Sequence, residues 1–386
     1  MSQNEKNETS EKIKFDDMGL KENVLRGIYS YGFEHPSLIQ SKAIPLIMEG
    51  GDIIAQSQSG TGKTGAFSIG TLQMVDEKTP GCQAIIISHT RELAQQIHNV
   101  IKSLSIYTGI KIVLCIGGQD RRQTREALRT GSIIVVGTPG RIIDLVSSNA
   151  LALKNLKLLV VDEADEILSI NFREQIKTII QELPTNAQIA LFSATMPDEM
   201  LLLTQKFMRD PKRILIDKEN LTLDGIKQFY VNVINEGWKF DTFCDIFNTV
   251  SIGQTIVYVN SVKRAEQLKY SLEKQQFSVS LIHSYMTLAE RGQVMKEFRN
   301  GGTRILVSTD LLSRGIDIQQ ISVVINFDLP KNKECYLHRI GRSGRFGRKG
   351  IAINFIAKYE LKYLKDLEKH YDIEIEQMPT NLQDYL

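Results

Sequence analysis

Cysteine is scarce in this sequence, and its few copies are far apart. The 386 residues include four cysteines, with no C-x-x-C pair and no histidine at a matching metal-binding spacing. This pattern excludes a disulfide framework and a cysteine–histidine zinc module. We therefore expect reduced thiols in an intracellular protein at Cys82, Cys115, Cys244 and Cys335.

Long apolar runs are also missing. No stretch approaches the roughly 20 apolar residues that a membrane-spanning helix needs, so we expect no membrane partner. Residues 1–12 are polar and charged and lack the apolar segment of a secretory signal. We expect residues 1–14 to form a disordered tail.

The chain has almost no net charge, because 47 Lys+Arg residues and 45 Asp+Glu residues leave +2. Such a weak overall field does not attract a polyanion. Any nucleic-acid binding must therefore come from local basic clusters.

Apolar residues make up 42% of the sequence and charged residues 24%, as in an ordinary globular protein. The length indicates two domains. Short β-branched apolar runs alternate with helical patterns, which predicts an α/β fold with parallel sheets covered by helices on both faces. The runs lie at 84–88, 111–116, 133–137, 158–161, 189–192 and 214–216, and then at 229–233, 255–259, 279–282, 304–307, 323–326 and 351–355.

A polar, turn-prone segment divides this pattern into two halves. We place the first domain at residues 15–218, a short flexible linker at 219–225 and the second domain at 226–386. Only the first half contains a Gly-Lys-Thr loop. We therefore expect a nucleotide to bind to the first half and to be sensed by the second.

The segment SQSGTGKT, residues 57–64, follows one apolar run and precedes a helical pattern. A strand, a glycine-rich loop and a helix form a phosphate cradle, because backbone N–H groups and the helix dipole favour an anion there. Lys63 would reach the β- and γ-phosphates, and the Thr64 hydroxyl would bind Mg²⁺. Ser57 stands where the usual pattern has glycine, and a simple turn that begins a helix is the alternative interpretation.

A group of carboxylates, Asp162-Glu163-Ala164-Asp165, follows the apolar run 158–161. At the end of a buried parallel strand, Asp162 is placed to hold Mg²⁺, and Glu163 is placed to orient or deprotonate an attacking water. An acidic helix N-terminus stabilised by the helix dipole is the alternative.

The densest basic run is HRIGRSGRFGRK, residues 338–349. A solvated or nucleic-acid-binding face is the ordinary interpretation of such a run. Arg342 and Arg345 are three residues apart, so they can point the same way from a helical turn. Guanidinium groups that contact a γ-phosphate act as arginine fingers, which raise the rate of hydrolysis by a factor of about 10³–10⁵.

Together and in this order, these motifs resemble the DEAD-box family of ATP-dependent RNA helicases from about residue 15 to the C-terminus. The resemblance implies two RecA-like domains, each a parallel sheet with helices on both faces, and an RNA-dependent ATPase. Residues 32–40, GFEHPSLIQ, look like the adenine-reading Q motif. Gln40 would hydrogen-bond the adenine edge, Phe33 would lie against the ring, and Phe15 matches the upstream aromatic.

The resemblance also implies ATP and Mg²⁺ as ligands. Asp317 matches the family's ribose contact, and Ser193 and Thr195, which alone would be an ordinary N-cap, match the motif that couples ATP state to RNA binding. The implied sets are ATP-binding Phe15, Phe33, Gln40, Ser59, Gly60, Thr61, Gly62, Lys63, Thr64 and Asp317; catalytic Lys63, Asp162, Glu163, Arg342 and Arg345; metal-binding Thr64 and Asp162; and coupling Ser193, Thr195, Asp165 and His338.

The implied partner is RNA, as a single strand or a short duplex held without regard to sequence. Hydroxyls, backbone N–H groups and arginines suit phosphates and 2′-hydroxyls. The matching positions are Thr90, Arg91, Gly118, Thr138 and Arg141 in the first half and Asn260, Arg291, Thr309 and Arg314 in the second. We expect activating or scaffold proteins to supply specificity.

Within the family, LTLDGIKQFY (221–230) and EQMPTN (376–381) resemble the group of translation initiation factor 4A. AQSQS (55–59), WKFD (238–241) and GRSGR (341–345) look more like its nuclear paralogues, whereas TDLL (309–312) and IQQ (318–320) look more like the initiation factor. We expect a role in rRNA processing and ribosome biogenesis or in mRNA metabolism, with the nucleus or nucleolus favoured over the cytoplasm. The initiation helicase is the alternative.

The sequence departs from the family pattern at three places. Ser88-His89 replaces Ala-Pro, Ser284-Tyr285 replaces glycine and an acid, and Ser313 replaces alanine. None of these changes removes a catalytic group. The first two lie near loops expected to face RNA, so they bear on RNA affinity or partner docking.

The resemblance implies domains that are open when empty and that close on ATP and RNA, bending one RNA strand away from its partner. An ATP-gated RNA clamp within a multiprotein assembly would carry the same motifs, and only the lifetime of its RNA complex would differ. A DNA helicase is a third interpretation, which the family likeness disfavours.

Overall fold

The computed structural model describes residues 13–58, 60–168, 173–215, 226–310, 321–343 and 350–385. Its residue contacts divide the chain into two compact units. The first comprises Met1–Ala55, Thr61–Ser193 and Pro197–Leu215, and the second comprises Gln56–Gly60, Ala194–Met196 and Ile216–Leu386. The expected linker at 219–225 lies outside the described residues.

The first sheet has seven strands in the order β3-β4-β2-β5-β6-β1-β7. Its strand pairs run parallel, with Ile85 opposite both Val135 and Leu159. The inner strands are mostly apolar and buried, as expected for a sheet that has helices on both faces, whereas the edge strand β3 is partly buried and β7 begins with the exposed Lys212 and Arg213. They are β1 Ile53–Gln56, β2 Ala84–Ile87, β3 Ile112–Cys115, β4 Ile134–Gly137, β5 Leu158–Asp162, β6 Gln188–Ser193 and β7 Lys212–Ile214.

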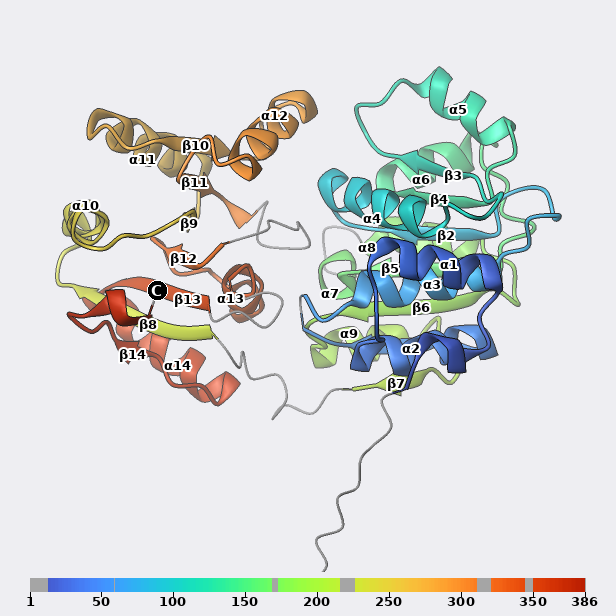
Figure 1. The fold of residues 1–386 in the computed structure, drawn as a ribbon, viewed down its shortest axis with the longest axis horizontal. Helices are drawn as coiled ribbons and strands as arrows, with labels where there is room; N and C mark the ends of the chain where they lie inside the picture. Colours follow the sequence, from blue (N-terminus) through green and yellow to red (C-terminus); the bar gives the residue numbers. More distant parts are fainter. Residues whose placement is uncertain are drawn as a thin grey trace, which may run out of the picture. The chain divides into compact units, whose positions relative to one another are not determined.

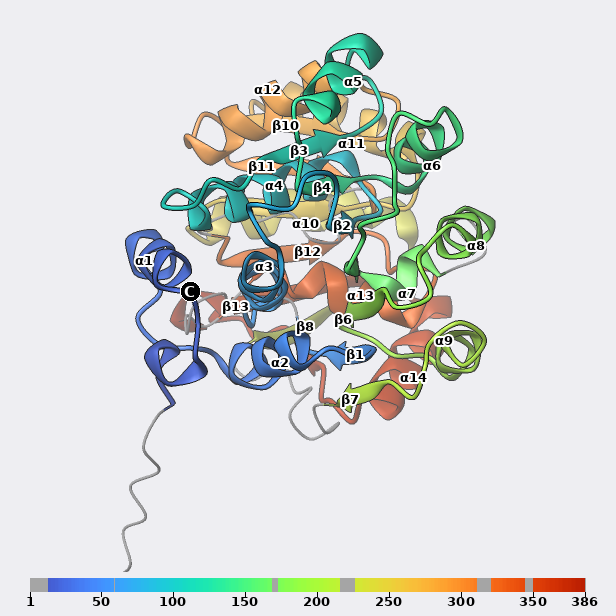
Figure 2. The same cartoon turned by 90° about the vertical axis from the view of Figure 1, so that its right-hand side faces the viewer.

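Helices cover both faces of this sheet. Figure 2 shows α1 to α4 along one face and α6, α8 and α9 along the other. The helices are the 3₁₀ turn Phe15–Met18, α1 Glu22–Tyr31, α2 Leu38–Glu49, α3 Lys63–Met74, α4 Arg91–Leu104, α5 Arg121–Arg129, α6 Pro139–Ser147, α7 Ala164–Ile167, α8 Arg173–Gln181 and α9 Asp198–Thr204.

The second sheet also has seven parallel strands, in the order β10-β11-β9-β12-β13-β8-β14 (Figure 1). The strands are β8 Ile226–Val233, β9 Thr255–Tyr258, β10 Val279–Ile282, β11 Ile305–Ser308, β12 Val323–Asn326, β13 Gly350–Ala357 and β14 Glu376–Gln377. The helices are the 3₁₀ turn Glu236–Trp238, α10 Lys239–Thr249, α11 Val262–Lys274, α12 Leu288–Arg299, α13 Lys333–Ile340, the 3₁₀ turn Lys358–Glu360, α14 Leu361–Tyr371 and the 3₁₀ turn Leu382–Tyr385.

Successive side chains along the strands of the second sheet pack into different hydrophobic clusters, one on each face of the sheet. Val257 packs in the cluster that contains Phe243 of α10 and Leu268 of α11, whereas its neighbour Ile256 packs with Phe298 of α12. Each fully buried side chain of this size contributes about 1.5–3 kcal/mol. The two-residue period of the strands thus fixes which helices lie on each face.

The predicted α/β class is confirmed, and every predicted apolar run contributes to a strand of one of the two parallel sheets. Strand β14 was not predicted, because it is only two residues long and both residues, Glu376 and Gln377, are polar and exposed. None of the helices in the described ranges is long and apolar enough to cross a membrane.

Candidate functional site

The glycine-rich loop joins β1 to the N-terminus of α3. Gly60 and Gly62 have φ of 85° and 106°, a left-handed conformation that favours glycine. Lys63 is the first residue of α3 and is only 7% exposed. A buried lysine beside a helix N-terminus suits an anion, so this geometry is compatible with the predicted phosphate site, which stays a prediction. Ser59 lies outside the described residues.

The N-terminus of α2 is attached to this loop through Gln40. The Gln40 Oε1 accepts a hydrogen bond from the backbone N–H of Ser37 at 2.9 Å, and its Nε2 donates to the carbonyl of Gly62 at 3.3 Å. Ser37 and Gln40 also form the capping box of α2. The residue predicted to read adenine therefore contacts the loop predicted to hold phosphate.

Gly65, one turn into α3, makes this close approach possible. A Cβ atom on Gly65 would lie 2.5 Å from the Gln40 Nε2 and 3.1 Å from the Phe33 ring. Sequence reasoning did not single out Gly65. The only signal was a glycine directly after Thr64, and its meaning depends on packing between helices that are distant in sequence.

Aromatic side chains gather beside Gln40. Phe33 stacks against Phe15 with ring centroids 6.4 Å apart, and the Tyr31 ring meets Phe33 edge-on at 4.9 Å. Phe15 is fully buried, so in this conformation it supports the Phe33 ring. The Tyr29 hydroxyl donates to the Asp16 carboxylate, and this hydrogen bond raises the pKa of Tyr29 to about 12.

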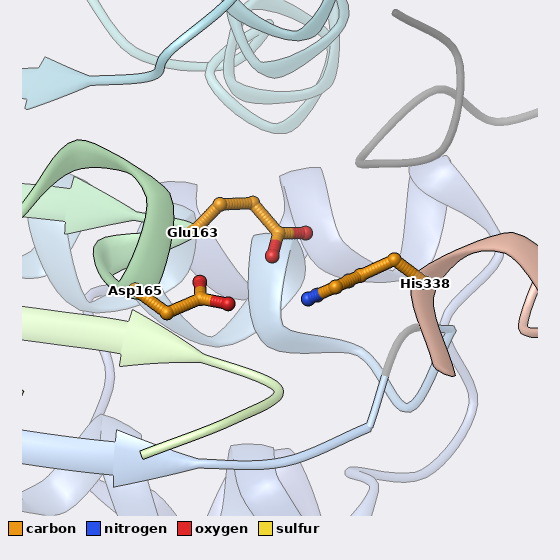
Figure 3. Close-up of side chains that lie close together, drawn as sticks. All are labelled: Glu163, Asp165 and His338. Carbon is orange, nitrogen blue, oxygen red and sulfur yellow. The ribbon is translucent and has the colours of Figure 1, made fainter. Parts of the chain in front are cut away.

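The predicted acids lie at the end of β5. Asp162 is its last residue, and Glu163 follows with a φ of 51°. The backbone N–H of Glu163 donates to Asp162 Oδ1 at 3.0 Å. Figure 3 shows the carboxylates of Glu163 and Asp165 directed to the same side of the start of α7. Asp165 accepts a 2.6 Å hydrogen bond from the Ser193 hydroxyl at the end of β6.

Burial is the main influence on Asp162. Burial and then the neighbouring Glu163 raise the pKa of this carboxyl, Lys63 opposes them, and the pKa lies at about 7. Placing anionic oxygens in a buried setting is costly without a cation. Buried carboxylate oxygens and the Thr64 hydroxyl are the kind of donors that Mg²⁺ prefers, so this chain's residues fit that ion.

A second group of predicted residues lines a cavity of about 470 Å³ in the first unit. Thr138 is the N-cap of α6, with Pro139 in its first turn, and Thr90 caps α4 by accepting from the Leu93 N–H at 3.2 Å. Two helix N-termini therefore lie near this cavity, and both favour anions. The lining is His89, Arg91, Gly117, Gly118, Gln119, Arg121, Thr138, Pro139, Gly140, Arg141, Asp144 and Gln175.

Arginines shape this cavity. The Arg91 guanidinium packs against the glycine loop, since a Cβ on Gly117 would lie 3.0 Å from it. Arg141 donates from Nη2 to the carbonyl of Gln119 at 2.7 Å and pairs with Asp144 at 3.2 Å. Arg141 thus positions the loop as well as supplying charge. Gln119 was not predicted, because its contribution comes from the backbone.

In the second unit, the predicted RNA contacts Asn260 and Thr309 follow β9 and β11, two adjacent parallel strands. They therefore lie at the same edge of the sheet. Asn260 is held in place by Asp328, whose carboxylate accepts from its N–H at 3.0 Å, and by the carbonyl of Leu329, which accepts from its Nδ2 at 2.7 Å. Arg291 is buried on α12.

Arg339 organises this edge and was not predicted. It is fully buried, and its guanidinium bonds Asp310 Oδ1 at 2.7 Å, the Asp328 carbonyl at 2.7 Å and Asn260 Oδ1 at 2.8 Å. The basic run gave a weak signal, since it did not show which of its arginines is internal. Arg342 Nε donates to the carbonyl of His338 at 3.2 Å.

Three further predicted residues lie outside the described residues: Arg314, Asp317 and Arg345. The arginine-finger role of Arg342 and Arg345 stays a prediction. The same holds for the coupling roles of Thr195 and His338, which are both buried.

Comparisons with known proteins show which family this chain belongs to. Residues 37–203 match the DEAD/DEAH box helicase family model, and residues 238–347 match the helicase conserved C-terminal domain. The chain is 50% identical over 372 residues to "Eukaryotic initiation factor 4A" of Caenorhabditis elegans, covering 96% of this chain and 92% of that protein. It is 49% identical over 386 residues to "ATP-dependent RNA helicase eIF4A" of Kluyveromyces lactis, covering 100% and 98%.

Solved structures of S. cerevisiae Dbp5 are similar as well. Dbp5 bound to RNA and ADP BeF3 matches with a TM-score of 0.90 and 35% identity, covering 96% of this chain and 97% of that one. A Dbp5 variant bound to a Gle1 variant and IP6 matches with a TM-score of 0.79 and 35% identity, covering 96% of each chain.

Proposed function

Since the chain belongs to the DEAD-box family of ATP-dependent RNA helicases, we propose how its residues divide the work of that activity. The observation that carries the proposal is the buried set Lys63, Asp162 and Glu163, which lies beside the N-terminus of α3 and at the end of β5. It supplies one cation, two carboxylates and a helix N-terminus, as phosphoryl transfer to water requires.

Lys63 and the N–H groups of the loop bind the β- and γ-phosphates. Mg²⁺, when bound through Thr64 and Asp162, neutralises phosphate charge. Glu163 orients the attacking water and accepts its proton. Phe33 and Gln40 bind the adenine, and the contact between Gln40 and Gly62 connects base recognition to the phosphate loop.

RNA is bound through the cavity lined by Arg91, Thr138 and Arg141 in the first unit and through the edge that carries Asn260 and Thr309 in the second. Hydroxyls and guanidinium groups suit phosphates and 2′-hydroxyls, so binding follows the backbone and carries little sequence information. We expect the choice of target to depend on partner proteins, and the relative Dbp5, as a variant, is bound to a protein partner, a Gle1 variant, in one solved structure.

For the biological process, the names of the curated relatives support a role in translation initiation. A nuclear role in rRNA processing and ribosome biogenesis is the second candidate. The segments AQSQS (55–59), WKFD (238–241) and GRSGR (341–345) favour it. Both candidates use the same ATPase and differ only in the RNA that is bound.

Glu163→Gln tests the chemistry and the process with one variant. The amide keeps the size of the side chain but cannot accept the proton from water, so the variant binds ATP and RNA while hydrolysis falls at least 100-fold. Glu166→Gln, with the same chemical change one turn along α7, is the matched control. Hydrolysis by Glu163→Gln at the wild-type rate would refute the assigned role of Glu163.

The same variant then identifies the RNA. Glu163→Gln is expressed with a tag, crosslinked in cells, and the bound RNA is sequenced. Messenger RNA leaders support initiation, pre-ribosomal RNA supports ribosome biogenesis, and spliced junctions would instead indicate an RNA clamp. Complexes that dissociate from wild-type protein within seconds in ATP support a helicase cycle, whereas retention for many minutes supports the clamp.

A further inference from the structure

Tyr285, in the turn after β10, is the most exposed large apolar side chain among the described residues, with 84% of its surface accessible. Single exposed aromatics are common on protein surfaces, so exposure alone assigns no role. The position of Tyr285 in the second sheet is more informative.

The strand register places Tyr285 at the edge of the sheet that carries the proposed RNA contacts. Strands β10, β11 and β9 are parallel neighbours, with Ile282 opposite Ser308 and Ser308 opposite Tyr258. Figure 1 shows the three strands side by side in this unit. Tyr285, Thr309 and Asn260 lie within three residues after Ile282, Ser308 and Tyr258, respectively. Tyr285 therefore extends the row of proposed RNA contacts to the end of β10, the outermost strand of the sheet.

The turn that carries Tyr285 is well defined. The N–H of Met286 donates to the carbonyl of His283 at 3.3 Å. Thr287 caps α12 by reciprocal hydrogen bonds with Glu290, including N–H to Oε2 at 2.7 Å. The buried His283 ring lies edge-to-face with the Tyr285 ring, with centroids 6.3 Å apart and planes at 75°. A tyrosine held this way loses little conformational entropy when it binds a ligand.

We propose that Tyr285 stacks on a base of the bound RNA and is an additional RNA-binding residue of this chain. The inference rests on the proposed RNA contacts at Asn260 and Thr309. Those two offer an amide and a hydroxyl, which suit the sugar-phosphate backbone, whereas an aromatic ring offers a face for a base. Tyr285 is also uncharged, so it adds no negative charge to a surface proposed to bind a polyanion.

The test measures binding of a fluorescent ten-nucleotide oligoadenylate to the full chain by anisotropy, with Mg²⁺ and a non-hydrolysable ATP analogue. Tyr285→Ala weakens binding about 5- to 100-fold, the range for losing one base–aromatic stack. Tyr285→Phe keeps the ring and binds like wild type. Tyr270→Ala, which removes a tyrosine that is 61% exposed on α11, leaves affinity unchanged.

An oligonucleotide with abasic sites separates stacking from backbone contacts. It has phosphates but no bases to stack, so wild type and Tyr285→Ala bind it equally. If wild type binds oligoadenylate and Tyr285→Ala binds it as tightly, the inference is overturned while the proposed function stands. If Tyr285→Phe is as weak as Tyr285→Ala, stacking is overturned in favour of a hydroxyl contact. Failure of wild type to bind any RNA would overturn both.

Discussion

Gly65→Ala tests whether Gln40 and the phosphate loop form one adenine-binding unit. The added methyl carbon would lie 2.5 Å from the Gln40 Nε2 and 3.1 Å from the Phe33 ring. The Gln40 amide is the far end of a flexible side chain, so it can swing away. It then loses its 3.3 Å hydrogen bond to the carbonyl of Gly62. We therefore expect a larger effect on base recognition than on folding.

The magnitudes support this expectation. Alanine is better than glycine in a helix by about 1 kcal/mol, whereas overpacking a core costs about 1–3 kcal/mol. The net destabilisation is then about 0–2 kcal/mol. Displacing Gln40 removes hydrogen bonds worth about 0.5–1.5 kcal/mol each and disturbs Phe33. Adenine preference should thus fall about tenfold or more.

The assay compares the Kd values for ATP and GTP by fluorescence titration and follows unfolding in urea. Gly292→Ala is the matched control: a Cβ there meets nothing within 4 Å, so we expect stabilisation by up to about 1 kcal/mol and unchanged ATP binding. The reasoning is refuted if Gly65→Ala keeps the wild-type preference for ATP over GTP.

Three further predictions follow from individual contacts. Because burial and Glu163 raise the pKa of Asp162 to about 7, protons compete with Mg²⁺ there, so Mg²⁺-dependent ATP affinity falls as the pH is lowered from 8 to 6. The same raised pKa means that ionisation of Asp162 reduces folding stability as the pH rises from about 4 to 7. Asp162→Asn removes both trends, which ATP titrations and unfolding experiments would check. Arg339→Met leaves its acceptors, including the half-buried Asn260 Oδ1 and the buried carbonyl of Asp328, without their donor, which costs the second unit about 1–3 kcal/mol per buried acceptor in urea unfolding; a loss below 1 kcal/mol would contradict this role. Arg141→Lys cannot donate to Gln119 and pair with Asp144 in the same geometry, so RNA affinity falls about tenfold while the Kd for ATP stays the same; an equal loss for ATP would indicate misfolding of the first unit.

The fold could be predicted because its signals are local in sequence. A buried parallel strand is a short apolar run such as 84–88, and the next helix follows within a few residues. The positions of Lys63 and Asp162 were predictable for the same reason, since each directly follows a strand or loop whose sequence pattern is distinctive. Features of this kind need no knowledge of what packs against them.

Residues that act through tertiary contacts were not predictable. Arg339 belongs to a basic run that looks like a solvated surface, yet it is fully buried among three strand ends that the sequence does not place together. Gly65 matters because it has no side chain, and Gln119 matters because its backbone carbonyl accepts a hydrogen bond from Arg141. Neither contribution leaves a chemical signature in the sequence.

The contact between Gln40 and Gly62 has a consequence for how the nucleotide is selected. Ser37 and Gln40 together cap α2, and a Cβ on Gly62 would lie 2.8 Å from both of their side chains. The cap therefore packs directly against the turn at Gly62, with no room for a side chain between them. We expect a base that draws Gln40 out of position to remove its hydrogen bond to the Gly62 carbonyl and so to disturb the turn before Lys63. Adenine recognition and phosphate binding are thus two outcomes of one packing arrangement, so a nucleotide with the wrong base should be held poorly at its phosphates as well.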